Sequence, residues 1–387
     1  NCSCSSRISR ESISVAAASQ AEKSVMNEPR TGHPFHLYDA IHQQPALVRR
    51  MISEHSDLVA RAARAAAEKE RLWIVGIGSS LYTAEIAEYF FRHLTCGRAD
   101  VRVGQSFEFV FCPPALSKRD AVIILSHTGI TKCTIDALEF ARRAGALTIG
   151  ISGENEGEAM RSVDFLIPTC EQEVPFAYTK SLTSALARLA SFSIAFAEIR
   201  SEKNFVAKNS LSGIPDLMQQ ALGLEAKMKD VAREIADRRR IILIGTGPSW
   251  PTAREVALKI KETSFAPAEG EQTEQLRHGP FSEIDERMTL IALLAGGPAD
   301  ERTRMVVRAA GETGAHRIVF HVPAARPDDS ADDWIAIPAV DEWLSSFLFL
   351  VPLQLLTYFL ALARGTNPDH GRLDQPAHAR ARKIYKY

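Results

Sequence analysis

The chain has 387 residues, of which 45% are hydrophobic and 24% are charged, and its formal net charge is −1. This composition is typical of a soluble globular protein with room for two domains, and the near-zero charge gives no reason to expect a nucleic-acid partner. The six cysteines lack the paired spacing of a zinc site. We therefore predict no metal and no cofactor, and reduced thiols that are typical of a cytoplasmic protein.

The beginning of the chain predicts a leader, helices and one strand. Residues 1–37 open with a Ser- and Ala-rich segment, which predicts a disordered leader or tail. Helices are expected up to residue 70. An apolar run, LWIV, then predicts a buried strand that ends in Gly78, Ser79 and Ser80 and leads into a helix. A short strand and a turn are expected over 101–110.

The stretch from Ala121 to Thr131 is the most informative part of the chain. An apolar run ends in Ser126, His127 and Thr128, and a helix is expected from Thr131. A strand, a hydroxyl-rich turn and a helix N-terminus together form a cradle for an oxyanion, because free N–H groups and the helix dipole point at the turn. A phosphate monoester would suit it. An ordinary strand–helix turn capped by Ser or Thr is the alternative, and the residues alone leave both open.

The second half of the chain repeats the first. Further strands at 147–152 and 165–169 precede a long helix at 178–199, and after a helical segment the pattern restarts with IILIGTGPS at 241–249, which resembles LWIVGIGSS at 72–80. We therefore predict an internal duplication of an α/β unit, in which helices cover both faces of a parallel, flavodoxin-like sheet. The predicted parts are a first domain at 38–200, a connector at 201–238, a second domain at 239–364 and a tail at 365–387.

The apolar stretch 343–363 raises the question of a membrane span. It is long and uncharged, but Pro352, Gln354 and two serines interrupt it, and a helix buried at a domain or subunit interface has the same composition. We favour the buried helix and predict no membrane partner.

The two copies differ where chemistry is expected. The second copy ends its central strand in AGGP, without hydroxyl groups, but carries the charged helix PTAREVALKIKETSF. Its residues Glu255, Lys259 and Glu262 lie at i, i+4 and i+7 on one helix face. His278 follows, before a Gly-Pro pair. The alternatives are a solvated charged stripe and a surface histidine in a turn.

Four blocks taken together resemble the tandem sugar isomerase (SIS) domain family: VGIGSS, LSHTGIT, EVALKIKE with LRHGP, and VPLQLLTYFLALARGTNPD. The resemblance is to the isomerase half of glucosamine-6-phosphate synthase. It extends to stand-alone relatives that deaminate amino-sugar phosphates or deglycate fructosamine phosphates. It covers residues 40–370 and implies two α/β domains of the three-layer kind.

The resemblance also assigns roles to residues. It implies Glu262 as the proton-moving carboxylate, His278 as the ring-opening histidine, and Glu255 and Lys259 as their neighbours on the helix face. The implied substrate- and phosphate-binding residues are Ser79, Ser80, Ser126, His127, Thr128, Thr131 and Ala177. The family's usual residue at position 127 is glutamine, so His127 is a departure.

The tail departs from the family as well. The family's tail lysine falls on Pro376 or Ala381, neither of which has an amine, and the nearest substitutes are Arg380, Arg382 and Lys383. The resemblance implies a homodimer in which the neighbouring subunit supplies His278. We expect no production of ammonia from glutamine, because too few residues precede the first domain to hold an amidotransferase half.

The leading functional hypothesis is deamination and isomerisation of an amino-sugar phosphate, such as glucosamine 6-phosphate, to a ketose phosphate and ammonia. The alternatives are a fructosamine-phosphate deglycase, a simple aldose–ketose isomerase, and a non-catalytic phosphosugar sensor. A sensor would need the cradle but neither Glu262 nor His278.

Overall fold

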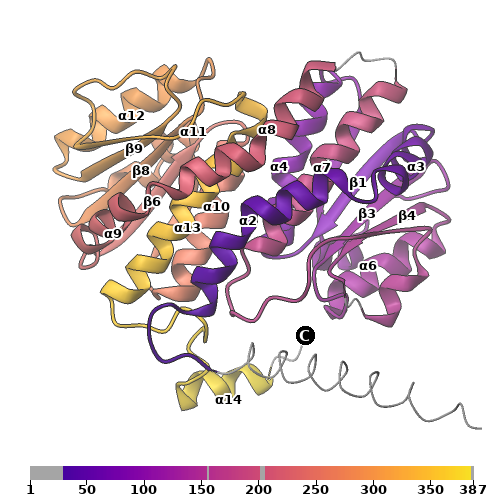
Figure 1. The fold of residues 1–387 in the computed structure, drawn as a ribbon, viewed down its shortest axis with the longest axis horizontal. Coiled ribbons are helices and arrows are strands. Elements are labelled where there is room, and N and C mark those ends of the chain that lie inside the picture. The colour runs from indigo at the N-terminus through magenta and orange to yellow at the C-terminus, as the bar shows by residue number, and fades with distance from the viewer. Residues whose placement is uncertain (1–28, 155–156, 201–204, 385–387) are drawn as a thin grey trace, which may run out of the picture.

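The computed structural model describes residues 29–154, 157–200 and 205–384. Two parallel five-stranded sheets form its two halves, and long helices pack between them (Figure 1). The first sheet has the order β2-β1-β3-β4-β5. Its strands are β1 (Arg71–Gly76), β2 (Asp100–Gln105), β3 (Asp120–Ser126), β4 (Leu147–Ser152) and β5 (Phe165–Pro168).

The second sheet has the order β10-β9-β8-β6-β7. Its strands are β6 (Arg240–Gly245), β7 (Ala268–Gln272), β8 (Met288–Leu294), β9 (His316–His321) and β10 (Asp333–Ala336). Read from β7, this is the strand order of the first sheet, and β6 pairs with β7 and β8 as β1 pairs with β2 and β3. The predicted duplication and the α/β three-layer fold are therefore confirmed.

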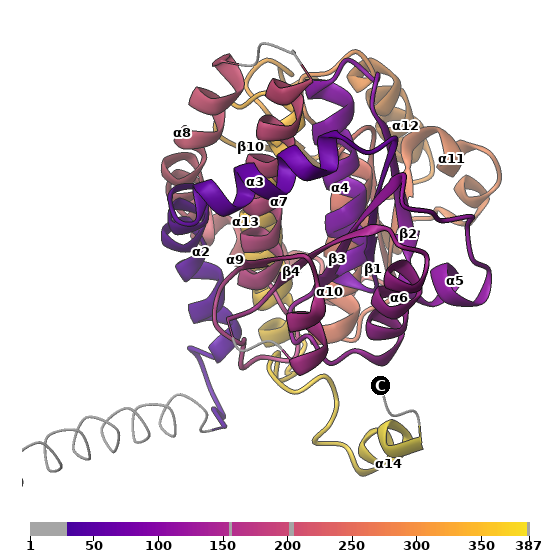
Figure 2. The same cartoon turned by 90° about the vertical axis from the view of Figure 1, so that its right-hand side faces the viewer.

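Helices cover both faces of each sheet, as two views of the fold show (Figures 1 and 2). In the first half, α4 (Ser79–Leu94) and α7 (Lys180–Ile199) lie on the inner face, and α5 (Ser106–Phe111) and α6 (Lys132–Arg143) lie on the outer face. In the second half, α10 (Ser249–Thr263) and α13 (Ser345–Ala363) are inner, and α11 (Thr273–Arg277) and α12 (Asp300–Glu312) are outer. The remaining helices are α2 (His36–Ser53), α3 (Ser56–Ala67), α8 (Phe205–Leu222), α9 (Glu225–Glu234) and α14 (Pro376–Ile384).

Some local expectations were wrong. The turn expected before residue 110 is helix α5, because the Gln105 side chain accepts the first free N–H groups, those of Phe107 and Glu108. Strands β7 and β10 were not predicted, since AEGEQ and DWIA show little apolar pattern. Phe35 and Leu37 are buried, so the expected leader overlaps the fold. The predicted domain limits stay a prediction.

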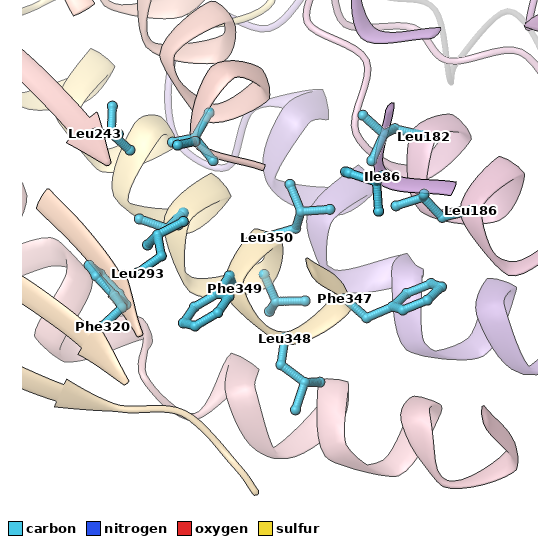
Figure 3. Packing of buried hydrophobic residues seen from close by; sticks show 14 of the residues in the cluster. Ile86, Leu182, Leu186, Leu243, Leu293, Phe320, Phe347, Leu348, Phe349 and Leu350 are labelled. Atoms are coloured by element: carbon cyan, nitrogen blue, oxygen red, sulfur yellow. The ribbon is translucent and has the colours of Figure 1, made fainter. Parts of the chain in front are cut away.

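One hydrophobic core joins the two halves. Figure 3 shows the side chains of α13 between the sheets, with Phe349 on the side of Phe320 and Phe347 on the side of α4. Phe347 stacks on Phe90 of α4 with ring centroids 6.3 Å apart. Two stretches, α7 and Glu342–Ala363, are long and apolar enough to cross a membrane, but 72% and 89% of their apolar windows are buried in the protein. The 343–363 helix is a core helix between the two halves.

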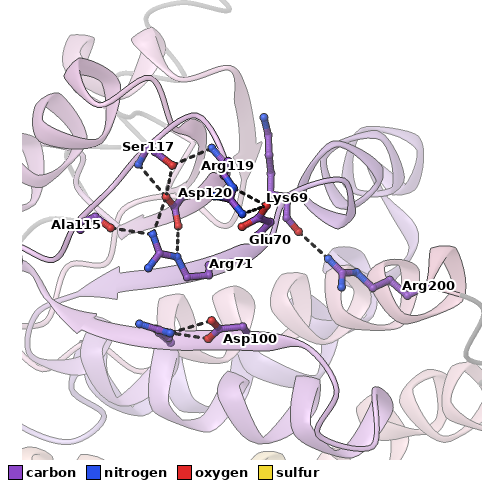
Figure 4. A network of polar contacts seen from close by, with 10 residues as sticks. Lys69, Glu70, Arg71, Asp100, Ala115, Ser117, Arg119, Asp120 and Arg200 are labelled. Carbon is purple, nitrogen blue, oxygen red and sulfur yellow. Dashed lines mark hydrogen bonds and ion pairs between the residues drawn. The ribbon is translucent and has the colours of Figure 1, made fainter.

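A buried ion pair secures the amino-terminal edge of the first sheet (Figure 4). Arg71 Nε lies 2.6 Å from Asp120 Oδ1, and the Ser117 N–H donates to Asp120 Oδ2 at 2.8 Å. Burial alone would raise the pKa of Asp120, but these hydrogen bonds lower it below its usual value. The pair ties β1 to β3, the two strands whose opposite ends carry the candidate site.

Candidate active site

A cleft of about 990 Å³ opens at the carboxyl ends of β1 and β3. These neighbouring strands are followed by helices on opposite faces of the sheet, α4 and α6. The two connections therefore diverge and leave a crevice, as in other open α/β sheets. The cleft is lined by three parts of the chain: the loops after β1, β3 and β5, the last turns of α10, and the tail after α13. The predicted residues that line it are Ser79, Ser80, Ser126, His127, Thr128, Thr131, Lys259 and Glu262.

The residues of the predicted oxyanion cradle lie together at the end of β3 in the first half. The Ser126 hydroxyl accepts a hydrogen bond from the Gly129 N–H at 3.1 Å, and this bond closes the loop before α6. Thr131 precedes the first turn of α6, and its hydroxyl makes no capping bond to the helix. Thr128 and Thr131 both line the cleft. The hydroxyl groups and the start of α6 thus face one space, as an anion site requires.

The start of α7 lies beside this cleft, and its N-terminus already has an anion. The Glu173 carboxylate, which the sequence analysis missed, accepts the N–H groups of Thr179 and Ser181 at the start of α7, the latter at 2.8 Å. The first turns of α4 and α6 lack such a carboxylate cap. A bound phosphate would therefore be attracted to α4 and α6 rather than to α7.

His127 is held neutral at the base of the cradle. Its Nε2 accepts the N–H of Glu173 at 3.3 Å, which places the ring proton on Nδ1. Burial lowers the pKa of His127 below its usual value, and the ring packs edge-on against Tyr178 at 5.3 Å between centroids. The departure from glutamine therefore adds no positive charge to the loop at neutral pH.

The charged face of α10 is not a solvated stripe. Lys259 Nζ lies 2.7 Å from Glu262 Oε2 and 3.5 Å from Glu255 Oε1, and only 3% of the Lys259 side chain is exposed. Helices α4 and α13 enclose α10, which buries Glu255 completely, while 22% of the Glu262 side chain remains exposed at the cleft. Burial raises the pKa of Glu255 to about 7. Despite burial, the two carboxylates raise the pKa of Lys259 above its usual range.

Glu255 does not line the cleft. It connects α10 to the start of α4, which does. The Ser79 hydroxyl, at the first residue of α4, donates to Glu255 Oε1 at 3.1 Å. Arg254 adds a second link between the same helices, with Nη1 2.6 Å from both carboxylate oxygens of Glu85. The hydroxyl loop of the first half and the Lys259–Glu262 pair of the second half are thus held in one geometry.

The segment around Ala177, which the resemblance implies as substrate-binding, forms one wall of the cleft. Ala177 is itself buried, whereas its neighbours Phe176 and Tyr178 line the cleft. The Phe176 N–H donates to the Asp369 carbonyl at 2.9 Å, and Arg382 lies over the Phe176 ring at 4.9 Å. The tail thus brings Arg382, one of the substitutes for the family's lysine, into the cleft lining. An arginine keeps its charge, so it offers a phosphate or hydroxyl partner and not a proton carrier.

The structure does not bring His278 to this cleft. It follows α11 on the outer side of the second half, 71% of its side chain is exposed, and its Nε2 lies 3.6 Å from Glu274. Within one chain it is remote from Glu262, and the role that the resemblance implies would require a second copy.

The corresponding loop of the second half is already occupied. At the end of β8, the Gly296 N–H donates to Asp300 Oδ2 at 2.9 Å. A Cβ on Gly297 would meet the Glu342 carboxylate at 2.5 Å, so the two lie in close contact. Burial raises the pKa of both acids. Two carboxylates thus lie at this loop.

Among the described residues, one group of side chains has the spacing of metal ligands. Atoms of Glu234, His316 and Asp333 lie within 4.8 Å of one another. His316 and Asp333 begin their strands, so the group lies at the amino edge of the second sheet, away from the cleft. Lys227 Nζ is 2.5 Å from Asp333 Oδ1 and offsets the negative charge that a cation would need.

Comparison with known proteins agrees with this architecture. The sequence profile of the SIS domain family matches residues 66–195 and 234–364. A glutamine–fructose-6-phosphate aminotransferase (isomerizing) of Thermococcus kodakarensis is 28% identical over 348 residues, which are 89% of this chain and 58% of that protein. The chain thus spans little more than half the length of this relative.

Solved structures resemble the fold over most of the chain. The C-terminal domain of glucosamine-fructose-6-phosphate aminotransferase from Francisella tularensis superposes with a TM-score of 0.81 and 22% identity, over 88% of this chain and 99% of that one. A glucosamine-6-phosphate deaminase from Thermotoga maritima superposes with a TM-score of 0.70 and 20% identity, over 87% and 97%. At these identities the likeness concerns the fold alone.

Proposed function

The chain belongs to the SIS domain family, and from this premise we propose that it is an enzyme that acts on a phosphorylated amino sugar. The observation that carries the proposal is that the Lys259–Glu262 pair lines the same cleft as the hydroxyl cradle. The cradle would hold the phosphate at one end of an open-chain sugar. Its reacting carbons would then lie near a carboxylate that can move a proton.

In the proposed reaction, Glu262 takes the proton from C2 of an open-chain 2-amino-aldose phosphate and returns it to C1. The C1 oxygen also gains a proton and the amine loses one, so the product is an imine at C2 beside a C1 alcohol. Water then adds to the imine, ammonia leaves, and a ketose phosphate remains. Lys259 carries a positive charge beside Glu262, so it would stabilise the negative charge that develops on the C1 oxygen during the transfer.

We prefer deamination among these reactions, because a protein of the same fold is named a glucosamine-6-phosphate deaminase. The test is an ammonia-release assay with glucosamine 6-phosphate and with fructosamine 6-phosphates, beside an assay of aldose–ketose interconversion. Ammonia and ketose phosphate in equal amounts from glucosamine 6-phosphate would support deamination. Interconversion without ammonia would instead support the simple isomerase. Binding of several sugar phosphates with no turnover would support the sensor.

We further propose that the protein is a homodimer and that it works in the cytoplasm. The apolar 343–363 helix does not support a dimer, because it is buried in its own chain. An exposed aromatic pair on α5 supports a dimer instead: the rings of Phe107 and Phe111 lie tilted with centroids 4.3 Å apart, and Phe111 is 65% exposed. The four described cysteines are free thiols, which suits a reducing compartment.

Sedimentation analysis tests the dimer. We expect a dimer for the parent protein and a monomer for a Phe107→Ser/Phe111→Ser variant, since two exposed rings would no longer be buried between the chains. Exposed Met305, on α12 of the other half, provides the matched control. A parent protein that is monomeric at all concentrations would contradict the proposal.

A further inference from the structure

A histidine of the same chain lies in the cleft without an assigned role. His370, in the tail between α13 and α14, lines the same cavity as Lys259 and Glu262. Within the described part of the chain, neither nitrogen of its ring makes a hydrogen bond or an ion pair. Histidine is the side chain that most readily gains and loses a proton near neutral pH.

The residues on either side of His370 hold it in place. Asp369 caps the N-terminus of α2, because its two carboxylate oxygens accept the N–H groups of His36 and Leu37 at 2.9 Å each. Gly371, with φ of +52°, packs so closely on the Phe176 ring that a Cβ there would lie 2.4 Å from it. A short segment anchored at both ends keeps its middle residue at the cleft, as an acid–base group requires.

Most other ionisable groups of the cleft already have partners, and His127 Nε2 accepts the N–H of Glu173. Lys259 is paired with Glu262, Glu173 caps α7, and Asp369 caps α2. Arg382 does not exchange protons near neutral pH. Asp374 lies at the exposed mouth. His370 is therefore the group best placed for a proton transfer that Glu262 does not perform.

We propose that His370 opens the sugar ring, an inference that rests on the proposed function. A sugar phosphate binds mostly as a cyclic hemiacetal, whereas the transfer between C1 and C2 needs the open chain. The anomeric hydroxyl gives its proton to the His370 ring as the bond between the anomeric carbon and the ring oxygen breaks. The carbonyl forms, and the imidazolium then gives a proton to the ring oxygen. His370 thus does within one chain what His278 could do only from a second copy.

The test separates ring opening from the proton transfer at carbon. In a Glu262→Gln background, which should not isomerise or deaminate, exchange between the α and β anomers of glucosamine 6-phosphate is measured by NMR. Ring opening is needed for this exchange and the Glu262 carboxylate is not. We expect Glu262→Gln to accelerate anomer exchange, and Glu262→Gln/His370→Gln to lose at least tenfold of that acceleration. His370→Asn should repeat the loss.

His378→Gln is the matched control, because this histidine lies in the same tail but is exposed and does not line the cleft. It should leave anomer exchange and turnover unchanged. Unaltered anomer exchange in the folded His370 variants, or a loss produced by His278→Gln alone, would overturn the inference and leave the proposed function intact. If the parent protein turns over no sugar phosphate, the proposed function itself fails.

Discussion

Lys259 carries a charge into the protein interior, and the carboxylates of its own helix make that possible. An ammonium group with 3% exposure would be very costly alone, but Glu262 and Glu255 lie 2.7 and 3.5 Å away. Glu262 alone of the two reaches the cleft. If α4 and α13 did not cover α10, these three residues would form an ordinary charged stripe on the surface.

Glu262→Gln should lower turnover by about 10²–10⁴-fold, the usual range for a lost acid–base group, because the amide keeps the size of the side chain but cannot accept the proton. Affinity for the sugar phosphate should change little. Steady-state kinetics and calorimetric titration with glucosamine 6-phosphate measure both. Glu255→Gln is the comparison. It should lower turnover less, since Glu255 only positions Lys259. Normal turnover by Glu262→Gln would place the chemistry elsewhere.

Loss of a hydroxyl group from the phosphate cradle should change KM rather than kcat. Ser126→Ala or Thr128→Ala removes one donor to a doubly charged group, and we expect KM to rise by about tenfold or more for each. The exposed Ser212 of α8 provides a control, as Ser212→Ala lies far from the cleft. An unchanged KM in both cradle variants would contradict this assignment.

Glu255 should make stability depend on pH. Burial raises its pKa from 4.5 to about 7, so between these values the folded protein keeps a proton that the unfolded chain has released. The unfolded state then binds fewer protons, and the free energy of unfolding falls as pH rises from 4.5 to 7. Denaturant titrations at several pH values should show a steeper fall between pH 4.5 and 7 in the parent than in Glu255→Gln. Parallel curves would contradict the ionisation that we assign.

At the scale of elements, α10 is positioned by a glycine in the neighbouring strand. A Cβ on Gly270 of β7 would lie 2.3 Å from the Arg254 backbone nitrogen, so helix and strand touch backbone to backbone. This close approach sets where α10, and with it Lys259 and Glu262, enters the cleft.

Gly270→Ala should therefore lower stability by about 1–3 kcal/mol and also lower kcat, because α10 must shift outward. Gly213 of α8 is the matched control, since no atom lies within 4 Å of the position that its Cβ would take. Gly213→Ala should be neutral or slightly stabilising, as alanine favours a helix. Thermal unfolding and steady-state kinetics test both variants. Equal stability of the two would show that the helix tolerates the added methyl group.

At the scale of the whole molecule, the two halves share one core and should unfold together. The same hydrophobic cluster includes Ile86 of α4, Leu350 of α13 and Phe320 of β9. A helix between two sheets gains burial from both, so neither half keeps its core if the other unfolds.

Leu350→Ala should lower the free energy of unfolding by about 2–5 kcal/mol, because Leu350 is fully buried between the halves. Two single-tryptophan variants, one with Trp73 of β1 and one with Trp334 of β10, report on the two sheets. We expect their denaturant transitions to coincide, and Leu350→Ala to shift both by the same amount. Two separate transitions would show that the halves are independent.

The sequence by itself determined the parts that depend on local pattern. Alternating apolar runs and helical periods predict the strands and helices, and the repeat of LWIVGIGSS as IILIGTGPS predicts two equivalent sheets. The hydroxyl groups after β3 predict an anion cradle, because a strand end, a turn and a helix start are neighbours in the chain. The spacing of Glu255, Lys259 and Glu262 likewise sets their common face.

Only the tertiary structure decided which distant segments meet. It brought α10 of the second half and the tail to the cleft of the first half, it buried Glu255 and Lys259, and it left His278 outside. It also revealed Glu173 and His370, neither of which stands in a recognisable motif. The contacts between the two halves join residues more than a hundred positions apart. Helix packing and a shared core set their distances, and no local period in a sequence encodes those distances.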